Sequence, residues 1–225
     1  EGFGKSMNLS MLKAFLELPA VGRAGRSFFA DTQIWDADGG RYRDDYACYP
    51  VISLDFSGAA WRGAAVAGVV RDALSGECAR LLPLLEAPDL PRDKMRHIER
   101  VARGVASEDE IASVLGVLIE LLEMACDEQV VLLVDGYDAA WLGRASARGA
   151  SGADSADLFD RVLFEAIATA GDSLRLTCLM GECPRPAEAA LSLHGCSYCL
   201  TTPLSTWCDR WFGFSDAEVQ ALLNH

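Results

Sequence analysis

A glycine, a lysine and a serine stand together near the first residue of the chain, in the segment Gly2-Phe-Gly-Lys-Ser6. A helical pattern of apolar residues follows at once. A phosphate-binding loop needs glycine so that backbone N–H groups can approach the anion. It also needs a lysine for the β and γ oxygens, a hydroxyl for Mg²⁺ and a helix N-terminus. Gly4, Lys5 and Ser6 are therefore predicted to bind the triphosphate of ATP, although the three residues alone would fit an exposed turn equally well.

A second motif lies at the end of an apolar run, Val130-Val-Leu-Leu-Val-Asp135. A P-loop ATPase needs a hydrophobic strand that ends in an aspartate for the magnesium ion, and a glutamate that polarises the attacking water often follows it. Asp135 fits the first requirement, whereas the next position holds Gly136. The two motifs are independent and stand in the required order. Together they predict that Ser6 and Asp135 hold Mg²⁺, the alternative being an aspartate that merely ends a buried strand.

Three apolar segments are predicted to be the strands that position these residues: 49–57, 129–135 and 174–180. They are apolar without alternation, which is typical of strands covered on both faces of a parallel sheet. Strands near 51–55, 130–135 and 174–180 should therefore lie parallel, with the third beside the second.

Helical patterns separate these segments. The clearest begins at the capping box Ser107-Glu-Asp-Glu110 and has apolar residues at helical spacing up to residue 122. Further helices are expected over 60–82, 93–103, 156–170 and from 215, and loops over 36–45, 83–92 and 143–155. Strands that alternate with helices indicate a three-layer α/β fold.

Composition excludes several classes of protein. The chain of 225 residues has 20 Lys and Arg against 33 Asp and Glu, a net charge of −13, so a surface that grips nucleic acid throughout is not expected. No apolar run approaches the roughly 20 residues of a membrane-spanning helix. The eight cysteines are mostly single among apolar neighbours, which favours reduced thiols and a cytoplasmic location. The one CxxC pair, Cys196 and Cys199, lacks a second pair that would indicate structural zinc.

The chain resembles the predicted AAA-ATPase-like family in four segments: GFGKSMNLSMLKAFLE, YPVISLDFSG, VVLLVDGYDAAW and FGFSDAEVQALL. These run in the family's order from residue 2 to residue 223. The resemblance implies a P-loop ATPase-like fold, ATP and Mg²⁺ as cofactors, and Walker A and Walker B motifs at Gly4-Lys5-Ser6 and Asp135. Family members often carry a PD-(D/E)XK nuclease-like domain as well, which is not found in these 225 residues.

Two departures from the family pattern fall on the machinery for hydrolysis. The family's DEYD is Asp135-Gly-Tyr-Asp138 here, so the position of the catalytic glutamate holds Gly136. The polar threonine of the family's LTG turn is replaced by Met180. Asp138 could stand in as the base, although its place two residues further along makes another orientation the stronger expectation. A glutamate introduced at position 136 is expected to raise the rate of hydrolysis with little change in affinity.

The sequence thus predicts a single AAA-ATPase-like domain over residues 1–225, truncated inside the phosphate loop, with the preceding strand missing and long strand edges exposed as a result. The predicted function is ATP binding with impaired hydrolysis. The alternatives are an active ATPase that drives a linked or nucleic-acid-directed effector, and an inactive relic. The nucleotide is the expected partner, nucleic acid is expected only indirectly, a membrane is not expected, and homo-oligomerisation is left open.

Two further features have ordinary explanations. Asp55 ends its strand where open α/β sheets place ligand groups, but it is expected to lie one strand outside the phosphate site as a solvated strand end. His97 lies in an arginine-rich helix, for which a solvated surface is favoured over a nucleic-acid face.

Overall fold

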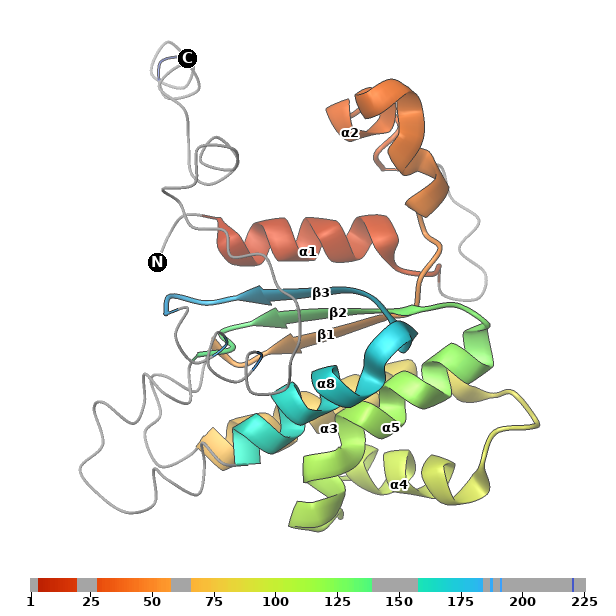
Figure 1. The fold of residues 1–225 in the computed structure, drawn as a ribbon, viewed down its shortest axis with the longest axis vertical. Coiled ribbons are helices and arrows are strands. Elements are labelled where there is room, and N and C mark those ends of the chain that lie inside the picture. Colours follow the sequence, from red (N-terminus) through yellow and green to blue (C-terminus); the bar gives the residue numbers. More distant parts are fainter. Residues whose placement is uncertain are drawn as a thin grey trace.

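The computed structural model describes residues 4–19, 28–57, 66–138 and 158–183, together with the single residues 187, 191 and 220. The described elements are, in chain order, α1 (Lys5–Leu16), α2 (Gln33–Asp36), η1 (Ala37–Asp45), β1 (Val51–Asp55), α3 (Val66–Leu81), η4 (Leu82–Leu85), α4 (Arg92–Ala102), α5 (Glu108–Cys126), β2 (Val130–Asp135), η5 (Arg161–Glu165), α8 (Ala166–Ala170), η6 (Gly171–Ser173) and β3 (Leu174–Met180). They form three layers, in which α1 covers one face of the sheet and α3, α5 and α8 cover the other (Figure 1).

The three predicted strands form one parallel sheet in the order β1-β2-β3. The prediction that 174–180 lies beside 130–135 is therefore confirmed, as is the α/β class with a parallel sheet flanked by helices. All three carboxyl ends lie at the same edge of the sheet, and this is also the edge at which α1 begins (Figure 1). The architecture thus brings the first turn of α1 and the last residues of the strands together.

Side chains of each strand alternate between two apolar clusters, one on each face of the sheet. Val51, Val131 and Leu133 pack with residues of α1 on one face. Ile52, Leu132 and their neighbours pack on the other face with the larger cluster formed by α3, α4 and α5. Every residue of β2 from 130 to 134 is fully buried, which explains why its sequence is apolar without alternation.

The helix predicted from the capping box is α5. The Ser107 side chain accepts a hydrogen bond from the Glu110 amide, and the Glu110 carboxylate accepts one from the Ser107 amide at 2.7 Å. These two bonds satisfy backbone donors that the first turn of a helix leaves free. The apolar stripe expected from the spacing, Ile111 to Leu122, is buried in the larger cluster.

Two segments expected to be loops are partly helical. Residues 37–45 form 3₁₀ turns, interrupted at Asp38, Gly39 and Gly40, which have positive φ. Proline 83 lies in the short 3₁₀ helix η4, because proline fits the first positions of a helix, where its missing N–H costs no hydrogen bond. The expected loop at 143–155, the expected helix from 215 and the CxxC pair lie outside the described residues. Among the described helices, none is both long and apolar enough to span a bilayer.

The two outer edges of the sheet differ. At the β1 edge, the buried Glu77 of α3 accepts a hydrogen bond from the Ser53 amide at 2.6 Å, and Arg80 donates to the Val51 carbonyl at 2.7 Å. Two backbone groups at this edge of β1 are therefore bound by side chains of α3. In the described part of the chain β3 pairs only with β2, and every residue of β3 is partly or fully exposed.

Candidate functional site

Gly4 and Lys5 form the N-terminal end of α1. Gly4 has φ +73° and ψ 13°, a left-handed conformation that glycine adopts without steric cost. The first turn of α1 contains no acidic residue, and Gly4 at the N-cap has no side chain that could cap it. Its backbone N–H groups and the positive end of the helix dipole are therefore not neutralised by a carboxylate of the helix itself, as an anion site requires.

Ser6 and Asp135 are in direct contact. The Ser6 hydroxyl donates a hydrogen bond to Oδ2 of Asp135 across 129 positions of sequence. The structure therefore brings the candidate magnesium ligands together at the carboxyl edge of the sheet, with Lys5 one residue before Ser6. A serine hydroxyl and a carboxylate are both hard oxygen donors of the kind Mg²⁺ binds, so the donor set present fits a magnesium-bound triphosphate.

Gly136 follows Asp135 in a left-handed turn with φ +66°. A Cβ at this position would lie 2.6 Å from the Ser57 backbone nitrogen and 2.7 Å from its Cα. No real Cβ comes so close to backbone atoms, and L-residues with side chains rarely adopt this φ. The expectation that a glutamate at 136 would raise the rate is thus corrected, because the turn has no room for a side chain without displacing the end of β1.

Asp138 makes a different set of contacts. It is 1% exposed, and its Oδ2 accepts hydrogen bonds from the backbone amides of Glu182 and Cys183 at 2.7 and 2.5 Å. A Cβ on Gly181 would meet the Asp138 carboxylate at 2.6 Å, which shows how tightly the turn after β3 closes over this carboxylate. These contacts favour a structural role for Asp138 over the catalytic one considered from the sequence.

Met180 stands beside Asp135 at the end of β3, since the two residues are partners in the ladder. The Met180 carbonyl accepts hydrogen bonds from the amides of Gly136 and Tyr137 at 2.8 and 3.3 Å. Its side chain packs with the apolar cluster beneath α1. The position where the family has a threonine therefore faces the α1 side of the sheet, but it offers a thioether in place of a hydroxyl.

Asp55 is an exposed strand end, as expected, and lies one strand beyond Asp135. It is the ladder partner of Asp135 on the side opposite Met180. Its Oδ1 accepts a hydrogen bond from the Ser57 amide at 2.9 Å, and its side chain is exposed. The sequence showed an aspartate at the end of an apolar strand, but the in-register pairing with Asp135 depends on strand alignment that residue types do not reveal.

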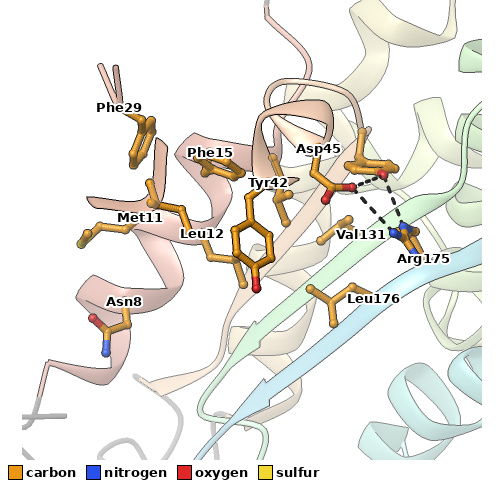
Figure 2. Close-up of a pocket in the computed structure, with 13 residues that line it drawn as sticks. Asn8, Met11, Leu12, Phe15, Phe29, Tyr42, Asp45, Val131, Arg175 and Leu176 are labelled. Atoms are coloured by element: carbon orange, nitrogen blue, oxygen red, sulfur yellow. Dashed lines mark hydrogen bonds and ion pairs between the residues drawn. The ribbon is translucent and has the colours of Figure 1, made fainter. Parts of the chain in front are cut away.

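A hollow of about 700 Å³ lies away from this site, between α1 and the exposed side of β3. Figure 2 shows Met11, Leu12 and Leu176 around its apolar part, and Asp45 and Arg175 at one end. Arg175 forms an ion pair with Asp45 and donates a hydrogen bond to the Tyr49 hydroxyl. It lacks the Ser6–Asp135 pair and carries no phosphate-binding pattern. The chemistry expected from the sequence is therefore not located in this hollow.

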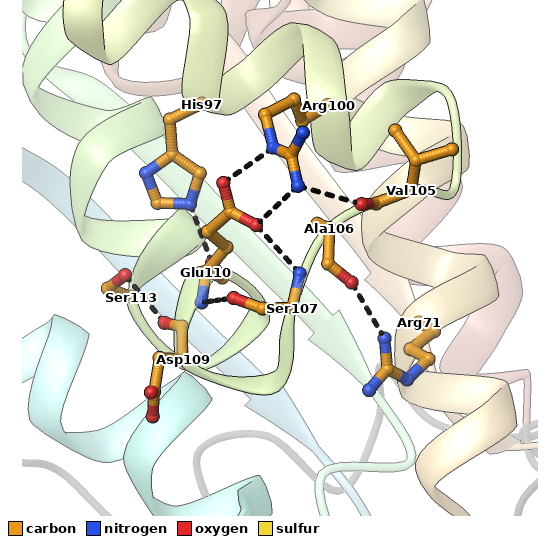
Figure 3. Close-up of polar contacts among 9 residues, drawn as sticks. All are labelled: Arg71, His97, Arg100, Val105, Ala106, Ser107, Asp109, Glu110 and Ser113. Carbon is orange, nitrogen blue, oxygen red and sulfur yellow. Dashed lines mark hydrogen bonds and ion pairs between the residues drawn. The ribbon is translucent and has the colours of Figure 1, made fainter.

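The arginine-rich helix α4 uses its charges against other elements. Lys94 pairs with Glu120. Arg100 pairs with Glu110, and the His97 ring bonds the Glu110 carbonyl at 2.7 Å (Figure 3). These contacts favour the solvated, ion-paired surface expected for this helix. In the residues for which side chains are described, no group of three or more His, Cys, Asp or Glu could hold a metal ion.

Comparison with known proteins gives one family. The model of a family described as predicted AAA-ATPase matches residues 2–184. No curated protein and no solved structure gives a significant match. The matched range includes Gly4, Lys5 and Ser6, all three strands, and the positions of Gly136 and Met180.

Proposed function

The chain belongs to the predicted AAA-ATPase family, and from this premise we propose that it binds Mg-ATP at the N-terminus of α1 and hydrolyses it slowly. The observation that carries the proposal is the contact between Ser6 and Asp135. The two sequence motifs meet at this contact, although 129 positions of sequence separate Ser6 from Asp135. A Mg-triphosphate must contact both motifs at once.

Binding would draw on groups of α1 and β2. Backbone N–H groups at Gly4 and in the first turn of α1 would surround the β-phosphate, with Lys5 on the β and γ oxygens. Ser6 and Asp135 would hold the magnesium ion, which neutralises charge on the phosphates when it is bound. Breaking the Ser6–Asp135 hydrogen bond would leave the serine hydroxyl and the aspartate carboxylate able to bind the metal.

Slow hydrolysis follows from the residues on either side of Asp135. Gly136 supplies no carboxylate, and the contact with Ser57 leaves no space for one. Met180 supplies no hydroxyl for the γ-phosphate or the attacking water. A missing general base typically lowers a rate by about 10²–10⁴-fold. Neither position belongs to the groups that would bind the nucleotide.

We also propose that a further strand, leading into Gly4, pairs with β3. Side chains of α3 bind backbone groups at the β1 edge, whereas β3 is half-exposed, so an added strand is supported at the β3 edge only. Leu176 of β3 and Met11 of α1 are 39% and 52% exposed, so a strand placed there would cover apolar surface as well as unpaired backbone groups. Residues of that strand would complete the glycine-rich part of the phosphate loop.

The test uses the full-length protein, with Mg-ATP affinity measured by calorimetry beside phosphate release. Lys5→Ala should weaken Mg-ATP binding by at least about tenfold, because a charged contact to phosphate contributes roughly 1.5–3 kcal/mol. Lys13→Ala is the matched control, since Lys13 lies in the last turn of the same helix, and it should bind as the unmodified protein does.

The possible results separate the alternatives. Binding with turnover far below 1 per second supports the proposal, because typical enzymes lie above that value. Fast turnover would replace it with an active ATPase. A folded protein that binds no nucleotide would leave the inactive relic.

A further inference from the structure

Asp55, Asp135 and Met180 form a row across the sheet at the carboxyl ends of the three strands. In-register residues of neighbouring strands lie about 4.8 Å apart and point to the same face. Val51 and Val131 of the same strands face α1, and Asp55 and Asp135 each lie four residues further along. Both carboxylates therefore stand on the α1 face, and Asp135 contacts Ser6 in the first turn of that helix.

The turn after β1 orients the Asp55 side chain and leaves no space for a side chain at position 136. The Ser57 amide donates to Oδ1 of Asp55 at 2.9 Å, and the same nitrogen lies 2.6 Å from where a Cβ of residue 136 would be. The Phe56 amide in turn donates to the Asp135 carbonyl at 2.9 Å, which fixes the turn against β2. The backbone arrangement that excludes a carboxylate after Asp135 thus holds another carboxylate beside it.

The side chain of Asp55 is exposed at the strand end. Within the described ranges, the Ser57 amide is the one hydrogen-bond partner of its carboxylate. Asp138, by contrast, is buried and its Oδ2 binds two backbone amides. Of these two carboxylates, Asp55 has the oxygen that can accept a hydrogen bond from water on the α1 face.

We propose that Asp55 positions the water that attacks the γ-phosphate, in place of the residue missing at 136. The inference rests on the proposed nucleotide site. The water oxygen forms a bond to the γ-phosphorus while the bond from that phosphorus to the β–γ bridging oxygen breaks. ADP leaves with the electron pair of the broken bond, and the proton of the water passes to an oxygen of the released phosphate. Asp55 accepts a hydrogen bond from the water and keeps its own charge throughout.

The experiment compares the unmodified full-length protein with Asp55→Asn, a variant of the same shape. Three quantities are measured: Mg-ATP affinity, single-turnover phosphate release, and the affinity for Mg-ADP in the presence of aluminium fluoride, which mimics the transferring phosphate together with its water. Asp89→Asn is the matched control, because Asp89 is an exposed carboxylate in the turn between η4 and α4. Asp55→Ala, checked for folding by circular dichroism, is the second variant.

Asp55→Asn and Asp55→Ala should leave the Mg-ATP affinity within about threefold. Both should lower phosphate release and the aluminium-fluoride-dependent affinity by about 10- to 100-fold, the value of a hydrogen bond to a charged group. Asp89→Asn should change none of the three quantities.

Each other result has a definite meaning. Equal release and equal aluminium fluoride affinity in both Asp55 variants would overturn the role of Asp55 and leave the nucleotide site standing. A parallel loss of Mg-ATP affinity would also overturn it, because Asp55 would then act in binding. If the unmodified protein is folded but binds no Mg-ATP, the proposed function itself fails.

Discussion

Replacing Gly136 by alanine is expected to lower the free energy of unfolding by about 2–5 kcal/mol. A left-handed backbone costs an L-residue about 1–2 kcal/mol, and Gly136 has φ +66°. The added methyl group would lie 2.6 Å from the Ser57 nitrogen, and forcing a group into filled space costs about 1–3 kcal/mol. The two costs add because the clash is with backbone, which cannot turn aside as the end of a long side chain can.

Gly104→Ala separates the two costs. Gly104 has φ +70°, almost the same as Gly136, but a Cβ there would meet nothing within 4 Å. Its replacement should therefore cost only the conformational part, about 1–2 kcal/mol. Gly116→Ala, in the middle of α5 with open space around it, should be stabilising by up to about 1 kcal/mol, because alanine favours helix over glycine.

The assay is equilibrium urea unfolding followed by circular dichroism. The three variants are compared with the same dependence of the unfolding free energy on urea concentration. The expected order of stability is Gly116→Ala, unmodified protein, Gly104→Ala and Gly136→Ala. Equal losses for Gly104→Ala and Gly136→Ala would refute the contact between the turn after β2 and the end of β1. Position 136 would then have room for a glutamate as well, and Gly136→Glu would be expected to hydrolyse ATP faster.

Two further predictions concern charged groups away from the site. Glu77→Ala should destabilise the domain by about 3 kcal/mol in urea unfolding, because it removes the buried partner of Arg80 and of the Ser53 amide. Glu99→Ala, which breaks a surface pair with Arg103, should change stability by less than about 0.5 kcal/mol. Equal losses of stability in the two variants would contradict the role of Glu77 at the β1 edge. Hydrogen bonds from Arg100 lower the pKa of Glu110 from 4.5 to about 2 (Figure 3), so the unfolded chain binds the proton first and stability should fall as the pH drops from about 5 to 2. Glu110→Gln, which keeps the side-chain shape of the capping box, should reduce that fall in a pH series of urea unfolding, and an unchanged pH dependence would show that the pair does not contribute.

The strands and their neighbours were predictable because the signal is carried by apolar runs. A segment such as 130–135 can bury every side chain only as a strand covered on both faces, which also makes its neighbours parallel. The capping box at Ser107 was likewise readable, since its two hydrogen bonds are between residues three positions apart. In both cases the deciding interactions are local or depend only on residue type.

The features that escaped prediction depend on contacts between distant segments. The alignment of Asp55 with Asp135 is set by the ladder between β1 and β2, and a shift of one residue would have turned Asp55 to the opposite face. The left-handed turn at Gly136 could be suspected from glycine alone, but the closeness of Ser57 could not. The 3₁₀ turns over 37–45 were missed because glycine-rich, charged sequence is typical of loops as well.

The groups proposed for nucleotide binding and those proposed for hydrolysis lie at different positions of the sheet edge. The groups proposed for binding lie on the first turn of α1 and on Asp135, whereas the departures from the family lie at Gly136 and Met180. Loss of a side chain at 136 removes no contact of Ser6 or Asp135, and the methionine at 180 still supplies the carbonyl that pairs with the Gly136 amide. The sheet edge therefore keeps its geometry while the groups that act on water change. A carboxylate on the neighbouring strand, already aligned with Asp135, is the position from which water can be oriented without rebuilding that edge.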